Sequence, residues 1–244
     1  MFDHVSIRVS DLQASRRFYE LAMKTLGFGE PATDGEHFEW YDFSLAEARP
    51  DRPVTNHLHA AFVATSRQAV DEWWRRMTDA GYRDDGEPGP RPQYSPDYYG
   101  AFVLDPDGNT VEAVHHGGTA EGENHVDHLW IRVANLPESS RFYELVGPFG
   151  GFRAAGARPW GEQFRGEARS FALVDDDRPT TENLHLAFPA ADNATVDAFH
   201  HALVEQGYRD NGGPGERDYH PGYYGAFVLD PDGNNVEVVC HNRD

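Results

Sequence analysis

The sequence contains the same set of short segments twice, about half a chain apart. Residues 4–9 (HVSIRV) return as residues 128–133 (HLWIRV), and the segment RFYEL occurs at both 17–21 and 141–145. The longer segment YYGAFVLDPDGN is identical at 98–109 and 223–234, and each copy leads into a Val-Glu pair. Matches in the same order with nearly constant spacing predict a duplicated domain, so each copy must form much the same fold.

The length of 244 residues fits two domains of ordinary size. Residues 117–124 (GGTAEGEN) are small and polar and predict a linker between domains at 1–116 and 125–244. One cysteine, Cys240, excludes an intramolecular disulfide. No apolar run is long enough for a membrane span and no secretory signal pattern opens the chain, so we expect a soluble, cytoplasmic protein.

Charge restricts the partners. The 41 acidic residues outnumber the 21 basic ones and give a formal net charge of −20. Such a surface repels the phosphates of nucleic acids and anionic lipid headgroups. The expected partner is therefore a small-molecule substrate, with no nucleic acid and no membrane, and the protein is expected to be a monomer or a homodimer.

Each copy shows two rounds of a strand, an amphipathic helix and further strands. Apolar residues alternate in the first strand, and Asp11 and Gly27 are suited to begin and end the first helix. In the first copy we expect strands at 4–9, 38–45, 58–63, 100–104 and 110–115, helices at 12–26 and 67–80, and a Gly/Pro-rich loop at 86–97. This pattern predicts the α+β class, with antiparallel sheet and the helices packed on one side of it.

Metal ligands are predicted at equivalent places in the two copies. The candidates are His4, His59 and Glu112 in the first copy and His128, His185 and Glu237 in the second. Each falls in a predicted strand, so three strands of one sheet can direct two imidazoles and a carboxylate to one point. Two histidines and one carboxylate leave other positions of the ion open, which suits Fe, Mn, Co, Ni or Zn rather than a closed structural site. The alternative is that these are ordinary polar residues of a half-exposed sheet.

These motifs resemble the vicinal oxygen chelate superfamily, which includes glyoxalases, type I extradiol dioxygenases, fosfomycin-modifying enzymes and bleomycin-binding resistance proteins. The resemblance is carried by DHVSIRVSDL (3–12), by NLHLAF (183–188), and by YGAFVLDPDGN leading to Glu112 and Glu237. It implies four βαβββ modules that form two U-shaped sheets with helices on their outer faces. It also implies a divalent metal held by the six residues named above.

Departures from the family patterns bear on the reaction. Isomerases of the glyoxalase type usually add a carboxylate ligand, for which Glu39 and Glu167 are weak candidates. Extradiol dioxygenases place a His and a Tyr before the ligand Glu, and here His220 fits whereas Phe227 replaces the Tyr. His220 and Tyr224 are the candidate catalytic residues, although Tyr223 and Tyr224 are also suited to simple packing. No cationic cluster for a phosphonate is evident.

The sequence thus predicts a metalloenzyme of the lyase, dioxygenase or transferase type that chelates a small substrate through vicinal oxygens. The alternative is a metal-free antibiotic- or metabolite-binding protein of the bleomycin-resistance type, in which Trp40, Trp160 and the tyrosine pairs stack on the ligand.

Overall fold

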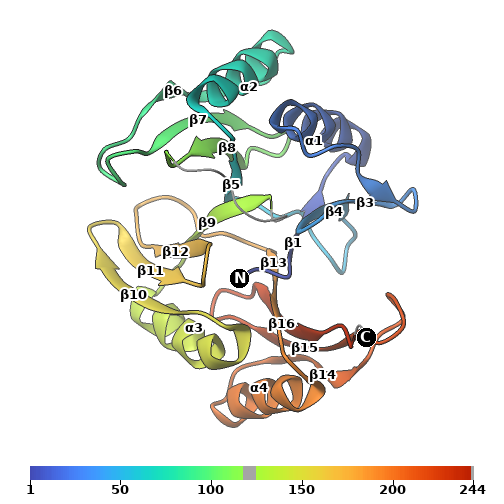
Figure 1. Ribbon diagram of the computed structural model, residues 1–244. Coiled ribbons are helices and arrows are strands. Elements are labelled where there is room, and N and C mark those ends of the chain that lie inside the picture. The colour runs from blue at the N-terminus through green and yellow to red at the C-terminus, as the bar shows by residue number, and fades with distance from the viewer. Residues whose placement is uncertain (118–124, 243–244) are drawn as a thin grey trace. The chain divides into compact units, whose positions relative to one another are not determined.

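A computed structural model describes residues 1–117 and 125–242, and it contains four βαβββ modules (Figure 1). The first copy contributes β1 (His4–Val9), α1 (Leu12–Leu26), β2 (Ala32–Thr33), β3 (His37–Trp40) and β4 (Phe43–Glu47), then β5 (His59–Val63), α2 (Arg67–Asp79), β6 (Asp84–Pro90), β7 (Tyr99–Leu104) and β8 (Thr110–His115). The second copy contributes β9 (Val126–Arg132), α3 (Leu136–Gly150), β10 (Arg153–Arg158), β11 (Gly161–Arg165) and β12 (Ser170–Val174), then β13 (His185–Pro189), α4 (Asn193–Glu205), β14 (Asp210–Glu216), β15 (Tyr224–Leu229) and β16 (Asn235–Cys240). The predicted α+β class and modular build are confirmed.

The strands form two open sheets of eight. Their strand orders are β14-β15-β16-β13-β1-β4-β3-β2 and β10-β11-β12-β9-β5-β8-β7-β6. The sheets are mixed rather than wholly antiparallel, because β5 pairs with β8 and β13 with β16 in parallel. A helix and two strands separate the members of each parallel pair along the chain, which is the long connection that parallel pairing requires.

The contacts divide the chain into two compact units. Unit 1 comprises Met1–Val5 and Trp130–Asp244, and unit 2 comprises Ser6–Leu129, so the division falls inside β1 and β9. The domain limits predicted from the repeat, 1–116 and 125–244, stay a prediction. All of the predicted linker except Gly117 lies outside the described residues.

The helix ends follow from local chemistry. The Asp11 side chain accepts the backbone N–H of Ala14 at 2.9 Å and caps α1, which ends at Gly27 with φ +88°. Ser66 caps α2 in the same way by accepting the N–H of Ala69. Both predicted helices of the first copy are therefore confirmed to within a residue or two of their expected ends.

The predicted loop at 86–97 is wrong in its first part, because β6 extends from Asp84 to Pro90. The strand is the last in its sheet and pairs only with β7 among the described strands. Because β6 has no second neighbouring strand in the described part of the sheet, the missing N–H of Pro90 costs no hydrogen bond. Gly86 and Gly89 border the two irregularities in its pairing with β7. The glycine-rich β14 pairs with β15 in the same irregular way.

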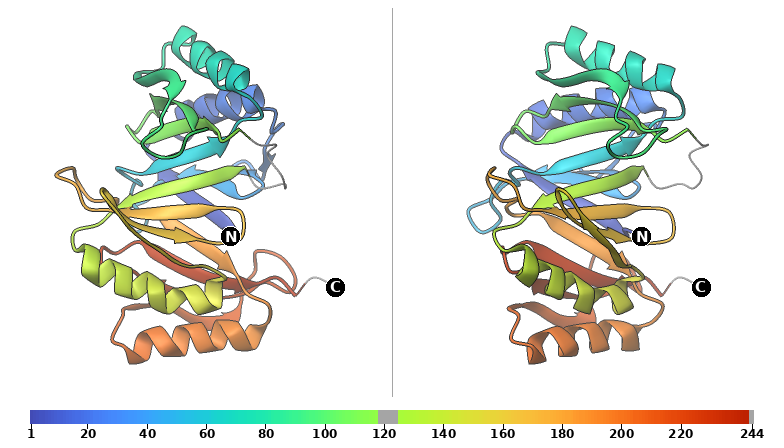
Figure 2. Two further views of the ribbon diagram at one scale, coloured as in Figure 1. Left: turned by 60° about the vertical axis from the view of Figure 1, so that its left-hand side comes forward. Right: turned by 90° about the vertical axis from the view of Figure 1, so that its left-hand side faces the viewer.

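Each unit has an aromatic core between its helices and strands. In unit 2, Tyr19 of α1 and Phe62 of β5 both contact Phe43 of β4, with ring centroids 5.0 Å apart in each pair. In unit 1, Phe164 and Phe171 stack at 4.9 Å beneath α3. Figure 2 shows α1 beside α2 and α3 beside α4 in both views, and these helix pairs are in contact. Burial of these rings against the helices leaves the opposite strand faces to carry polar groups.

Among residues 1–117 and 125–242, the helices are all too short or too polar to span a bilayer.

Candidate metal centres

In unit 1, three of the predicted ligands converge. We call His4, His185 and Glu237 the His4 centre. The two Nε2 atoms are 3.0 Å apart, and Oε2 of Glu237 lies 3.1 Å from Nε2 of His185 and 3.6 Å from Nε2 of His4. The parallel register aligns Ala187 of β13 with Glu237 of β16. His185 therefore points to the same face as the carboxylate, two residues before its partner position.

In unit 2, the same arrangement is built from the other three residues. We call His59, Glu112 and His128 the His59 centre. Oε2 of Glu112 lies 2.9 Å from Nε2 of His59 and 3.5 Å from Nε2 of His128. The imidazole rings of His59 and His128 are stacked with centroids 5.6 Å apart. All three residues are buried, and Glu112 is fully enclosed.

The grouping of ligands differs from the one expected from the repeat. Each centre takes its first histidine from one copy and the other two ligands from the other copy. Backbone hydrogen bonds hold these segments in place: the N–H of Asp3 donates to Ala187 O at 2.9 Å, and the N–H of Val63 donates to His125 O at 3.0 Å. The sequence did not distinguish the two pairings, because both first strands carry the same alternation and the same histidine.

A tyrosine fixes the carboxylate of each centre. Tyr98 donates its hydroxyl to Oε1 of Glu112 at 2.6 Å, and Tyr223 donates to Oε1 of Glu237 at 2.6 Å. Burial, followed by the nearby glutamate, raises the pKa of both tyrosines, so both remain donors. The bond engages one carboxylate oxygen and leaves the other, Oε2, facing the histidines. Gly100, and likewise its counterpart in β15, makes room for this carboxylate, since a Cβ there would overlap Oε1.

A second carboxylate supports one histidine in each centre. Asp3 accepts from Nδ1 of His4 at 2.8 Å, and Asp127 accepts from Nδ1 of His128 at 2.8 Å. A proton held on Nδ1 leaves the lone pair on Nε2, the atom that faces the other ligands. Burial by itself raises the pKa of Asp127, but its hydrogen bonds to His116 and His128 outweigh burial and lower that pKa.

The charged groups of the His59 centre shift one another's pKa values. Burial raises the pKa of Glu112, but hydrogen bonds from His128 and His59 prevail and lower it to about 2. Burial lowers the pKa of His128, but Asp127 and Glu112 together raise it to about 10. Without a metal, His128 is therefore protonated at neutral pH between two carboxylates. That proton must leave before Nε2 can bind a cation.

The two candidate catalytic residues occupy different settings. The Tyr224 hydroxyl donates to Asp197 of α4 at 2.8 Å, on the helix side of β15 and away from Glu237. Its neighbour Tyr223 reaches the centre instead. Nε2 of His220 lies 2.8 Å from Nδ1 of His241, whose Nε2 lies 2.7 Å from Asp3. His220 is thus linked to the His4 centre through His241 and Asp3, and its ring also contacts that of Tyr223, with centroids 5.3 Å apart.

Other predicted contributors do not join a centre. Glu39 and Glu167 are exposed and belong to none of the three ligand groups found among the described residues. Trp40, offered as a stacking surface in the metal-free alternative, is only 2% exposed and belongs to the core. Trp160 stacks on Trp130 with ring centroids 5.0 Å apart.

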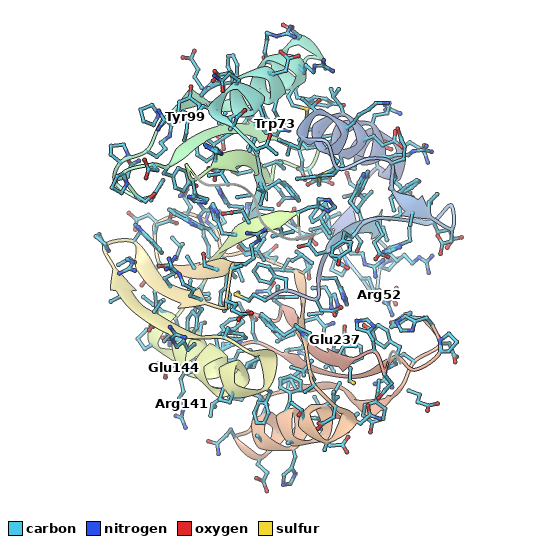
Figure 3. The ribbon with its side chains drawn as sticks, viewed as in Figure 1. Arg52, Trp73, Tyr99, Arg141, Glu144 and Glu237 are labelled. Atoms are coloured by element: carbon cyan, nitrogen blue, oxygen red, sulfur yellow. The ribbon has the colours of Figure 1, made fainter. Side chains whose placement is uncertain are left out.

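The donor set fits a divalent transition metal. Two ligand atoms about 2.1 Å from one ion and at right angles to each other are about 3 Å apart, which is close to the shorter separations in both centres. Two imidazoles and one carboxylate, with hydrogen-bonded carboxylates behind the imidazoles, form an open facial site. Glu237, labelled in Figure 3, projects from β16 as one of these ligands.

Comparison with known proteins places this chain in one family. The chain belongs to the Glyoxalase/Bleomycin resistance protein/Dioxygenase superfamily, whose family profile matches residues 1–113 and 125–238. The uncharacterized protein YqjT of Bacillus subtilis (strain 168) is 32% identical over 127 residues, which are 46% of this chain and 95% of that protein.

Two solved structures are similar over nearly the whole chain. Glyoxalase I from Zea mays has a TM-score of 0.66 at 20% identity, covering 98% of this chain and 92% of that one. A putative dioxygenase from Bacillus subtilis has a TM-score of 0.68 at 12% identity, covering 99% and 85%. At these identities the likeness shows the fold alone.

Proposed function

We propose that this protein is a metalloenzyme with two open 2-His-1-Glu centres, each of which chelates a small substrate through two adjacent oxygen atoms. The observation that carries the proposal is the convergence of three donor atoms in both units. Family membership supports it. A divalent Fe, Mn, Co, Ni or Zn ion held in such a centre supplies Lewis-acid stabilisation of negative charge on a substrate oxygen.

The surrounding residues have definable tasks in such a centre. Tyr98 and Tyr223 hold the glutamates in one orientation, and Asp3 and Asp127 hold one imidazole each in the tautomer that presents Nε2. Preset ligands lose less freedom when a cation and a substrate bind. Glu39 and Glu167, the carboxylates considered for an isomerase, are exposed and join neither centre, so the reaction class within lyases, dioxygenases and transferases stays open.

Metal analysis tests the proposal. Protein purified without added metal and then dialysed against a limiting chelator is expected to bind two ions per chain by mass spectrometry. His59→Ala and His185→Ala are each expected to lose one ion. His201→Ala is the matched control, because His201 is exposed on α4 and its side chain contacts Glu205 rather than a centre.

Double variants test the grouping of the ligands. His4→Ala/His185→Ala removes two ligands of one centre and should leave one ion bound, whereas His4→Ala/His59→Ala damages both centres and should leave none. If His4→Ala/His185→Ala instead left no ion and His4→Ala/His59→Ala left one, the ligands would be grouped by copy. If the wild type binds no transition metal and the single variants keep both stability and ligand binding, the metal-free binding protein becomes the better account.

A further inference from the structure

An arginine lies beside each centre on the same face of the sheet. Phe102 pairs with Glu112 across β7 and β8, so both side chains point to the face that carries the His59 centre. The ring of Phe102 is 5.8 Å from the ring of His59, and the guanidinium carbon of Arg91 lies 5.4 Å from the Phe102 centroid. One aromatic ring therefore separates a ligand imidazole from a cation.

The second unit repeats this arrangement. Phe227 pairs with Glu237, its ring lies 6.2 Å from that of His185, and the guanidinium carbon of Arg217 lies 5.2 Å from the Phe227 centroid. The same four roles, played by a glutamate, a histidine, a phenylalanine and an arginine, thus recur in both units. The duplication carries the arrangement into both units, so each unit offers a separate test of it.

Glycines create the space in which the guanidiniums lie. A Cβ on Gly89 would come within 2.9 Å of Nη1 of Arg91, and a Cβ on Gly215 within 3.1 Å of Nη1 of Arg217. Neither glycine has a left-handed φ, so the backbone itself does not demand glycine at these two positions. A Cβ at either glycine would therefore require the guanidinium of the neighbouring arginine to shift.

Backbone carbonyls orient the guanidiniums without neutralising them. Arg91 donates to Glu87 O at 2.8 Å and to Pro90 O at 3.3 Å, and Arg217 donates to Gly213 O at 2.6 Å. In the part of the chain that the structure describes, neither guanidinium has a carboxylate within ion-pair distance.

From this geometry, we infer that Arg91 and Arg217 bind a carboxylate on the substrate of the neighbouring centre. The inference rests on the proposed function and narrows the substrate class to small organic acids. Their adjacent oxygens occupy the metal while a carboxylate elsewhere in the molecule meets the guanidinium. A guanidinium has five N–H donors in a planar fork that matches a carboxylate, and the flanking phenylalanine excludes water from one side of the pair.

Two matched probes test the inference on Co(II)-loaded protein. Succinohydroxamate chelates through adjacent oxygens and carries a free carboxylate, whereas its methyl ester has nearly the same shape without that charge. Binding is followed by the visible absorption of Co(II), which needs no turnover. The wild type is expected to bind the acid about tenfold more tightly than the ester, as befits one charge-assisted, partly exposed contact.

Two kinds of variant should abolish this preference while leaving the affinity for the ester unchanged. Arg91→Gln/Arg217→Gln removes the charges, and Gly89→Ala/Gly215→Ala displaces them without removing them. Arg67→Gln is the matched control, because Arg67 covers the ring of Tyr99 at 5.3 Å on the opposite, helix-covered side of β7. It should keep the preference.

The outcomes separate the two proposals. If loaded wild type binds the acid and the ester equally, or if the double arginine variant keeps the preference, the carboxylate inference fails while the metalloenzyme stands. If the wild type takes up none of the divalent ions of Fe, Mn, Co, Ni and Zn, the metalloenzyme proposal is refuted and this inference with it.

Discussion

Removal of the buried tyrosine hydroxyls tests whether the glutamates are held in place as described. In Tyr98→Phe and Tyr223→Phe the ring is kept and only the 2.6 Å hydrogen bond to Glu112 or Glu237 is lost. The tyrosines are 6% exposed and the glutamates 1% or less, so water does not reach the vacated carboxylate oxygen. A buried charged acceptor that loses its donor costs about 1.5–3 kcal/mol of stability.

Urea unfolding of the metal-free protein measures this loss, and a shift of the midpoint at constant slope gives the free-energy change. Metal affinity is expected to fall by about 10- to 100-fold in the same variants, because the carboxylate is no longer oriented toward the histidines. A chelator competition gives that second number. The two units provide independent replicates of the measurement.

The adjacent tyrosines serve as controls. Tyr99 and Tyr224 donate to Asp71 and Asp197 at 2.7 and 2.8 Å, but in exposed settings on the helix side, where Figure 3 shows Tyr99 beside α2. Their replacement by Phe should cost less than about 1 kcal/mol, since water replaces the lost partner. Equal losses from the buried and exposed tyrosines would refute the orienting role.

Three further results are expected. Because the pKa of His128 is raised to about 10, metal binding by the His59 centre should release about one proton at pH 7, and the metal affinity should rise with pH until about 10. Calorimetry of His185→Ala, in which only the His59 centre is intact, measures the proton release in buffers of different ionisation enthalpy. A heat of binding that does not depend on the buffer would contradict this expectation. Gly161→Ala should destabilise by more than about 3 kcal/mol, since φ is +148° and a Cβ would overlap Leu173 O; an unchanged urea midpoint would exclude this. Removal of metal with EDTA should lower Tm, because free metal at a thousandfold excess over Kd stabilises by about 4 kcal/mol, and calorimetry with and without EDTA decides.

The sequence was sufficient to place all six candidate ligands on strands, because alternation and the repeat both act locally. It was not sufficient to group them. His4 and His128 sit in near-identical strands, so either copy offers an equally suitable neighbour, and only the packed structure distinguishes the two solutions. The alternation of residues within one strand does not encode which of two equivalent neighbouring strands it pairs with.

The supporting residues were predicted less well, for different reasons. Tyr223 and Tyr224 are adjacent where β15 begins, so only the direction of alternation decides which one reaches Glu237. Counting back from the ligand across the hairpin would have indicated Tyr223. The arginines were missed because their glycine-rich segments read as loops, although the spacing Gly-x-x-Gly-x-Arg at 86–91 recurs at 212–217 and carries the signal.

The exchange of first strands has a consequence for assembly. One copy made as a separate polypeptide would carry all three ligand types, yet it would complete a centre in this arrangement only by receiving a histidine from a second molecule. Its metal affinity would then depend on protein concentration. When the copies are joined in one chain, the histidine is supplied within the same molecule. Its effective concentration at the centre is then set by the covalent connection and not by the concentration of the protein. In the proposed metalloenzyme, the duplication thus makes metal binding independent of protein concentration.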